Sequence, residues 1–222
     1  MDRALYIAMT GATQTLKAQA LNSHNLANAS TVGFKAELAA QSAVAVDGPQ
    51  LATRVNTRLD GQGFDDRPGA VQHTGNPLDV ALAEDRWLAV QAADGVEGYT
   101  RAGDLRVGPD GLMRTAAGHL VMGEGGPVSV PQNTQLSVGG DGTLTVQPQG
   151  QGAETPVVIG RLRVVSATAA QLERGESGLM RARDGIEPEA AAGAVLTSGA
   201  LEGSNVNLAD AMVQMIQLAR SF

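Results

Sequence analysis

The sequence predicts a mainly β central domain of short antiparallel, hairpin-rich strands, plus an α-helical coiled-coil domain formed by the N- and C-terminal helices. Heptad-like apolar spacing occurs only at the two ends of the chain. Between the ends, short segments alternate apolar and polar residues with a period of two, as half-buried strands do. Asp-Gly pairs, a strong hairpin signal, interrupt these segments at 94–95, 110–111 and 141–142.

Residues 1–35 are expected to form one long helix that ends in a corner. Its apolar and small residues recur at threes and fours, which is typical of a helix that lies against another helix. The expected N-terminal seam is Leu5, Met9, Ala12, Leu16 and Leu26. Asn caps helices well, glycine supplies the positive φ of a sharp stop, and a following apolar ring can fold back on the last turn. The expected corner motif is Asn25, Asn28, Thr31, Gly33 and Phe34, although an ordinary helix C-cap would fit the same residues.

The middle of the chain has three expected parts. Residues 36–66 begin Ala-rich, become polar, and are expected to form an extended connector arm. Residues 67–183 are expected to form the central β domain, because many short strands at close spacing are typical of sandwiches and barrels. Strands are expected at 77–82, 87–90, 99–101, 105–107, 112–114, 120–122, 128–130, 136–138 and 144–146, with one long strand or two over 157–165. Residues 184–198 are expected to be a polar return arm.

Residues 199–222 are expected to complete the terminal-helix domain. Asn207 is a good N-cap, and Asp210 follows three residues later, as in a capping box. The expected C-terminal seam is Leu208, Met212, Met215, Ile216 and Phe222. A single helix pair attached through polar arms is marginal in stability. We therefore expect the pair to be fully ordered only in an assembly, where neighbouring copies cover its faces.

The composition excludes several function classes. A net charge of −7 and scattered basic residues argue against nucleic acid binding, which requires a concentrated basic face. The absence of cysteine excludes disulfides, a thiol nucleophile and a thiolate zinc site. No apolar run approaches the ~18 residues needed to span a bilayer, and residues 1–12 lack the apolar core of a cleavable signal peptide. Neither membrane insertion nor a cleaved signal is expected.

No catalytic, cofactor or metal site is predicted. The three histidines (His24, His73 and His119) are far apart and share no metal-ligand spacing with a carboxylate. Trp87 fits a core position better than a sugar-binding platform. The chain is therefore not expected to be an enzyme. Two alternatives stay open: a secreted β-rich carbohydrate-binding module that uses Trp87 and Tyr99, and a glycosidase with two carboxylates in a cleft.

Three motifs in order resemble those of the flagellar rod and hook family, the axial proteins of the bacterial basal body. They are NLANASTVGFK at 25–35, TGNPLDVAL at 74–82 followed by YTRAG at 99–103, and GALEGSNVN at 199–207. The opening residues and the compact middle are most similar to the F-type, proximal-rod members. The G-type, distal-rod members are the alternative, and the hook protein would need a much longer chain.

The resemblance implies a structural subunit of the flagellar proximal rod, which assembles into a helical axial tube that transmits motor torque. The implied partners are copies of the chain, other rod proteins and the flagellar type III export apparatus. The implied location is the periplasmic rod of the basal body, reached without signal cleavage. No small-molecule substrate or cofactor is implied. The resemblance also implies a C-terminal helix that continues several turns past Phe222.

Overall fold

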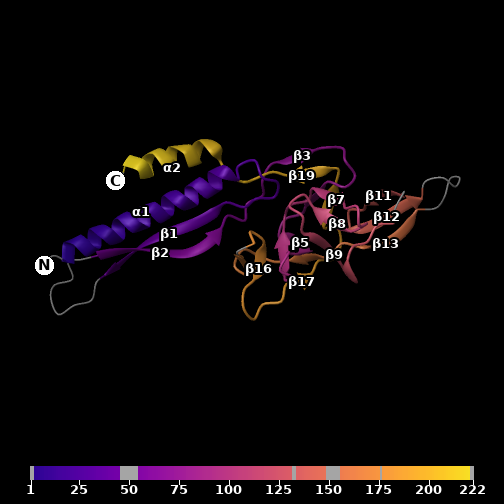
Figure 1. Cartoon of the computed structure of the whole chain (residues 1–222), viewed down its shortest axis with the longest axis horizontal. Coiled ribbons are helices and arrows are strands. Elements are labelled where there is room, and N and C mark those ends of the chain that lie inside the picture. The colour runs from indigo at the N-terminus through magenta and orange to yellow at the C-terminus, as the bar shows by residue number, and fades with distance from the viewer. Residues whose placement is uncertain (1–2, 46–54, 132–133, 149–155, 176, 221–222) are drawn as a thin grey trace.

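The structure is a computed structural model that describes residues 3–45, 55–131, 134–148, 156–175 and 177–220. The molecule is elongated, with both helices and one long hairpin at one end and the other strands at the opposite end (Figure 1). The predicted arrangement of two terminal helices around an antiparallel, strand-rich centre is confirmed. We call the two helices with the hairpin the helical base, and the remaining strands the β domain.

The two helices are α1 (Arg3–Ala27) and α2 (Leu208–Arg220), and they lie side by side (Figure 1). Helix α1 ends where the Asn28 amide and side-chain Nδ2 both donate to the His24 carbonyl, at 3.2 and 2.9 Å. At the start of α2, Asn207 Oδ1 accepts from the amides of Ala209 and Asp210, at 3.0 and 3.4 Å. The predicted N-cap is therefore confirmed, and the chain supplies both helix boundaries locally.

The long hairpin consists of β1 (Glu37–Ala45) and β2 (Val55–Phe64). The strands are antiparallel from Glu37 opposite Phe64 to Ala45 opposite Val55, with a register shift between Ala39 and Ala40. The hairpin runs beside α1 (Figure 1). The structure thus differs from the extended arm expected over 36–66. Pairing satisfies the backbone amides and carbonyls that a single extended segment leaves to water.

The largest sheet has the strand order β15-β16-β6-β5-β9-β8-β7, with β14 against β5 and β17, and β10 against β9. All of its pairs are antiparallel. Its strands are β5 (Arg86–Gln91), β6 (Glu97–Thr100), β7 (Leu105–Val107), β8 (Met113–Thr115), β9 (Leu120–Gly123), β10 (Gly126–Pro127), β14 (Val164–Ser166), β15 (Leu172–Arg174), β16 (Met180–Ala182) and β17 (Glu189–Ala190). The expected strand at 128–130 is reduced to one isolated bridge between Leu112 and Ser129.

Three smaller sheets complete the β domain: β11-β12-β13, β18-β4 and β19-β3. Their strands are β3 (Val71–His73), β4 (Val80–Leu82), β11 (Thr134–Val138), β12 (Thr143–Pro148), β13 (Val157–Arg161), β18 (Leu196–Ser198) and β19 (Ala200–Glu202). The expected apolar stretch 157–165 is therefore two strands, β13 and β14. The β11-β12-β13 sheet packs against the main sheet, since Leu136 of β11 and Leu144 of β12 share a core with Leu88 and Val90 of β5.

Strand β5 is buried on both faces. Leu88 and Val90 point into the main core, whereas Trp87 and Ala89 point into a second apolar cluster. That second cluster includes Phe64, the last residue of β2, whose ring meets Trp87 edge to face at a centroid distance of 5.7 Å. The end of the hairpin thus contributes to the core of the β domain.

The expected return arm, residues 184–198, also differs from the expectation. Strand β17 pairs with β14, and β18 pairs with β4. Val195 and Leu196 are buried in the main core. Their burial removes apolar side chains from water, which draws this segment onto the β domain.

The three Asp-Gly turns are confirmed, and they share one geometry. Gly95, Gly111 and Gly142 each have a positive φ, of 80°, 76° and 86°. In each turn, the preceding Asp accepts from the amide of the residue after the glycine, at 3.0–3.2 Å. Glycine tolerates this conformation, and the Asp side chain satisfies an amide that the turn would leave free.

The carbohydrate-binding alternative is wrong in its choice of residues. Trp87 is 3% exposed and donates from Nε1 to the Ala167 carbonyl at 2.9 Å. Tyr99 is buried in the same cluster, and its hydroxyl donates to Glu97 Oε1 at 3.0 Å. A ring that is packed on both faces cannot stack on a sugar, so neither side chain forms a binding platform.

Candidate functional site

The predicted seam on α1 lies on the surface of the chain. Leu5, Met9 and Leu16 are 66%, 59% and 54% exposed. Ala12 is also exposed, and Leu26 is half-buried near the end of the helix. At 100° per residue, the first four share one stripe along the helix.

The predicted seam on α2 has the same character. Leu208, Met212 and Ile216 are exposed, and Met215 is half-buried. Phe222 lies outside the described residues. Single exposed apolar residues are ordinary on proteins, but each of these helices carries a stripe of them, and exposed apolar patches are a feature of surfaces that bind another protein.

Helices α1 and α2 contact each other through a different face. The buried side chain of Asn22 donates from Nδ2 to the Ala211 carbonyl of α2 at 2.7 Å. Asn22 lies on the opposite half of α1 from Leu16, since six residues turn the helix by about 240°. The single chain therefore pairs its helices while both seams remain accessible.

The predicted corner residues are brought together. Asn25 bonds twice with the backbone of Glu37: Nδ2 donates to its carbonyl at 2.9 Å, and Oδ1 accepts from its amide at 2.8 Å. Thr31 donates to Asn28 Oδ1 at 3.1 Å. These bonds fix the first residue of β1 against the last turn of α1, so the chain reverses direction within about ten residues.

Gly33 is required for two reasons. Its φ is +66°, a conformation that L side chains rarely adopt. Its backbone also lies directly on the peptide between Arg101 and Ala102, so that a Cβ at this position would be 2.3 Å from the Arg101 carbonyl carbon. In addition, the Gly33 amide donates to the Glu202 carbonyl at 2.8 Å. The corner therefore touches the β domain as well as turning the chain.

The Phe34 ring contacts one aromatic and one cationic side chain. The His24 ring meets it edge to face at 5.6 Å, and the Arg174 guanidinium lies 4.8 Å from its ring centroid. Arg174, at the end of β15, also donates from Nη2 to the Lys35 carbonyl at 2.8 Å and forms an ion pair with Glu37. Burial lowers the pKa of Arg174 from its ordinary value, and Glu37 opposes that shift.

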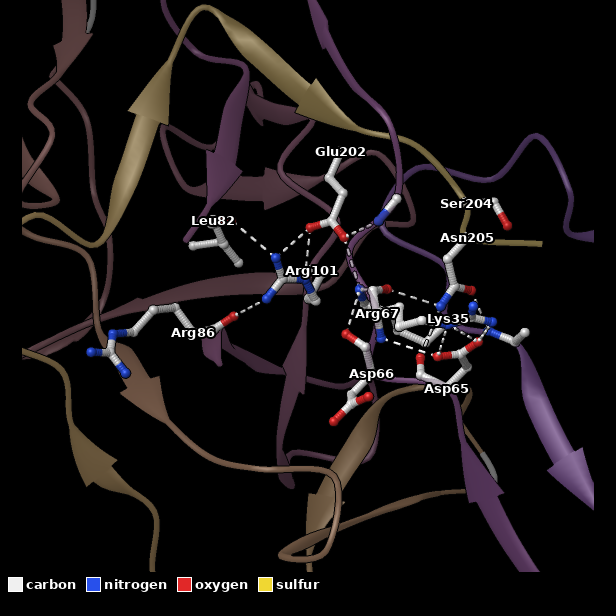
Figure 2. Close-up of polar contacts among 12 residues, drawn as sticks. Lys35, Asp65, Asp66, Arg67, Leu82, Arg86, Arg101, Glu202, Ser204 and Asn205 are labelled. Atoms are coloured by element: carbon white, nitrogen blue, oxygen red, sulfur yellow. Dashed lines mark hydrogen bonds and ion pairs between the residues drawn. The ribbon is translucent and has the colours of Figure 1, made fainter. Parts of the chain in front are cut away.

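Immediately behind the corner lies a buried charge cluster, which the sequence does not predict. We call Lys35, Arg101 and Glu202 the buried triad (Figure 2). The Lys35 and Glu202 side chains are 1% exposed, and that of Arg101 is 4% exposed. Lys35 Nζ donates to Glu202 Oε1 at 2.8 Å, and Arg101 Nε donates to Glu202 Oε2 at 2.7 Å. One carboxylate thus joins two cations.

Backbone carbonyls balance the second positive charge of the triad. Lys35 Nζ also donates to the carbonyls of Asp66 and Arg67, at 3.3 and 2.7 Å. The Arg101 guanidinium donates to three further carbonyls, those of Leu82, Ala83 and Arg86, at 2.9–3.1 Å. Both cations therefore find acceptors in place of the water that burial removes.

Burial and pairing act in opposite directions on these groups. Burial alone would raise the pKa of the Glu202 carboxyl, but Arg101, Lys35 and the Gly69 amide outweigh it, so the pKa lies below its ordinary value. Burial, assisted by Arg101, lowers the pKa of the Lys35 ammonium more than Glu202 raises it. The ionised carboxylate is thus the group that the site stabilises most clearly.

Asn205 closes the same junction from the C-terminal side. Its Oδ1 accepts from the Ala36 amide at 2.7 Å, and its Nδ2 donates to the carbonyls of Asp65 and Arg67, at 2.9 and 3.0 Å. Each member of the junction comes from one of the three resemblance motifs: Lys35 from the first, Arg101 from the second, Glu202 and Asn205 from the third. A charged residue inside each motif was the only sequence signal for this cluster.

Within the part of the chain that the structure describes, no group of three or more His, Asp or Glu side chains is placed to hold a metal ion. Over the same residues, neither α1 nor α2 is both long and apolar enough to cross a membrane. The functional features of the described chain are thus an exposed apolar surface and a buried ionic junction.

Comparisons with known families match three segments of the chain. Residues 5–35 match the family described as flagella basal body rod protein, residues 81–146 the flagellar hook protein FlgE/F/G D1 domain, and residues 197–222 the C-terminal part of flagellar basal body rod FlgEFG proteins. Lys35, Arg101 and Glu202 fall one in each segment.

Whole proteins align over the full chain. The flagellar basal-body rod protein FlgF of Salmonella typhimurium is 47% identical over 230 residues, which is all of this chain and 90% of the relative. FlgF of Escherichia coli K12 is 46% identical over the same shares. FlgG of Buchnera aphidicola subsp. Schizaphis graminum is 29% identical, over all of this chain and 92% of that protein. The likeness is thus greater to these two FlgF proteins than to this FlgG protein.

Proposed function

Since the chain belongs to the flagellar basal-body rod protein family and is of its F type, we propose that it is a structural subunit of the proximal rod that transmits motor torque by rigid packing. The families that match describe rod and hook proteins and include no enzyme. The observation that carries the proposal is the pair of exposed apolar seams on α1 and α2.

The seams are proposed to pack against the helices of neighbouring subunits in the rod. The support for this assignment is energetic: a Leu or Met side chain contributes ~1.5–3 kcal/mol when it is fully removed from water. In one chain that contribution is lost for Leu5, Met9, Leu16 and Met212, which are each about half exposed or more. The coiled coil predicted from the heptads is therefore proposed to form between subunits, beside the α1–α2 contact within each one.

We propose a division of labour along the chain. Residues 1–35 and 199–222 serve as the assembly domain, and the hairpin over 36–66 extends it. The rest, including residues 184–198, forms the β domain. The support is that the apolar seams occur on the helices, whereas the apolar side chains of β5 are buried.

The partners are proposed to be copies of this chain and other rod proteins, stacked along the axis of the basal body. The location is the periplasmic part of the rod, reached through the flagellar type III export apparatus without removal of a signal peptide. Residues 1–12, which lack the apolar core of a cleavable signal, support the export route.

The test uses charged substitutions in each seam, together with one outside them. Leu16→Asp and Met212→Asp place a charge where we propose a neighbouring helix, and both side chains are already exposed in the single chain. Val158→Asp is the matched control, since Val158 is 62% exposed and belongs to β13, which lies at the opposite end of the molecule from the helices (Figure 1). Each variant is expressed in cells that lack the native gene.

Both seam variants are expected to abolish swimming and to leave no rods visible by electron microscopy, while Val158→Asp swims. Purified seam variants are expected to melt at a temperature close to that of the unsubstituted chain, because both side chains are already about half exposed. Seam variants that still build rods, or that unfold the β domain, would contradict the assignment of the seams to assembly.

A further inference from the structure

The helical base and the β domain of the elongated molecule meet near its middle, and we call this region the junction (Figure 1). An elongated subunit that bends at such a junction cannot hold its two ends in a fixed relation. The groups that cross this junction therefore decide whether the chain behaves as one rigid body or as two hinged bodies.

Charged side chains make direct contacts between the helical base and the β domain. Lys35 leaves the base immediately after the corner and inserts between Glu202 and the carbonyl of Arg67 (Figure 2). In the opposite direction, Arg174 extends from the β domain onto the ring of Phe34 and the carbonyl of Lys35. These contacts are directional, so each holds its partner in one place.

An apolar contact reinforces the ionic ones. Phe64, the last residue of the hairpin, is buried in the second apolar cluster of the β domain against Trp87. The hairpin and the corner thus enter the β domain at two separate positions. Two attachment points restrict rotation more than either one alone.

Bending at this junction would leave the Lys35 ammonium without its partners in a region that is shielded from solvent. Glu202 would keep Arg101 and the Gly69 amide if the base rotated, but the Lys35 ammonium, whose side chain is 1% exposed, would lose the Glu202 carboxylate and the carbonyls of Asp66 and Arg67. A buried charge without its partner is strongly unfavourable. Intermediate orientations are therefore penalised, and one orientation remains.

We propose that Lys35 and Arg174 are positioning residues that hold the helical base at one fixed orientation to the β domain, through Glu202 and Phe34 respectively. The junction is a rigid joint and not a hinge. The contacts that hold this orientation all lie within one chain. Only its use, to carry force from the base to the β domain without bending, rests on the proposed rod function.

The test is a distance measurement in the full chain. Because the sequence contains no cysteine, Ala20→Cys on α1 and Arg106→Cys on β7 give two unique spin-label sites, both exposed. Pulsed electron paramagnetic resonance then reports the distribution of distances between the base and the β domain. The joint is altered by Lys35→Met, and Lys17→Met, at an exposed lysine on α1, is the matched control.

The labelled parent chain and Lys17→Met are expected to give one narrow distance distribution. Lys35→Met is expected to broaden it while the β domain keeps its cooperative melt. If Lys35→Met does not fold, Arg174→Met serves instead, since it loosens the joint without removing a charge from the triad. It is expected to broaden the distribution less.

Two results would overturn the proposal: a broad distribution in the labelled parent chain, or a distribution in a folded joint variant as narrow as in the parent. The swimming assay distinguishes failure of the joint proposal from failure of the proposed rod function. A narrow distribution in a chain that builds no rods keeps the joint and rejects the rod, whereas a broad distribution in a chain that builds rods does the reverse.

Discussion

Replacing Glu202 by glutamine is the most direct measure of what the buried triad contributes to stability. The amide has nearly the same shape as the carboxylate but no charge. It leaves Lys35 and Arg101 buried without a counter-ion, and it turns an NH₂ group toward one of the cations that donated to Glu202, at 2.8 and 2.7 Å. The Asp65 carboxylate, which also acts on the charge of Lys35, is already held by Arg67.

The expected loss follows from burial. Removing one partner of a buried ion pair costs ~3–5 kcal/mol, because the remaining charge stays in a site without water. For a chain of this size, each kcal/mol lowers the melting temperature by about 2–4 °C, so Glu202→Gln should melt roughly 6–20 °C lower. The free energy of unfolding is measured by urea denaturation and the midpoint by thermal circular dichroism.

The matched control makes the same change at a surface ion pair. Glu124 lies 3.7 Å from Arg161, and its side chain is 68% exposed. Exposed pairs contribute about 0–1 kcal/mol, so Glu124→Gln should leave the unfolding free energy almost unchanged. If Glu202→Gln is no more destabilising than Glu124→Gln, the triad is not a stabilising pair, and the reasoning from burial fails.

Three further predictions concern the same junction and its surroundings. Gly33→Ala should destabilise the chain by ~2–5 kcal/mol, from the positive φ together with the clash on the Arg101 peptide. Gly75→Ala is the control: Gly75 has a φ of +75° and nothing within 4 Å, so urea denaturation should show only the ~1–2 kcal/mol cost of the conformation. Equal losses in the two variants would contradict the close contact of Gly33 with the Arg101 peptide. Because the folded-state pKa of Glu202 is below its ordinary 4.5, the stabilisation by the ionised carboxylate is present above pH 4.5 and is lost as the pH falls through the lower folded value. Acid titration should therefore lower the unfolding free energy of the unsubstituted chain more steeply than that of Glu202→Gln, and parallel curves of unfolding free energy against pH would refute the pairing. Burial, assisted by Glu97, raises the pKa of Tyr99 to about 12, so ultraviolet titration should show a phenol step there that Tyr99→Phe removes, and a step unaffected by the substitution would contradict the burial of this ring.

The elements that the sequence predicts well are those whose signals are local. Heptad spacing identifies both helices, and Asp-Gly pairs locate three hairpins, because a 3.6-residue period and a positive φ are properties of short segments. The sequence does not predict the long hairpin because β1, with Leu38 followed by two alanines, lacks a clear alternation. Its strands are held by pairing with each other, which no single segment encodes.

The candidate site divides in the same way. The periodicity predicts the seam residues, but it does not say that α1 and α2 would meet through Asn22 and leave both seams exposed. The corner glycine is predicted from its turn, but its contact with Arg101 depends on the fold. Lys35, Arg101 and Glu202 each look like an ordinary surface charge, since charged residues are rarely buried unless paired. Only the tertiary structure brings the three together.

Lys35 and Glu202 lie far apart along the chain, so the contacts that complete the corner can form only after residue 202 is present. The two residues are 167 positions apart, and Asn205, which holds Ala36, comes later still. A chain that has emerged only as far as its β strands has no carboxylate for Lys35 and no carbonyl of residue 202 for the Gly33 amide. The contacts of Asn25 with Glu37 and of Arg174 with Lys35 can form in such a chain, but those of Glu202 and Asn205 cannot. Complete closure of the corner thus marks a chain that is present almost to its last helix, and a shorter chain holds its N-terminal seam by fewer contacts.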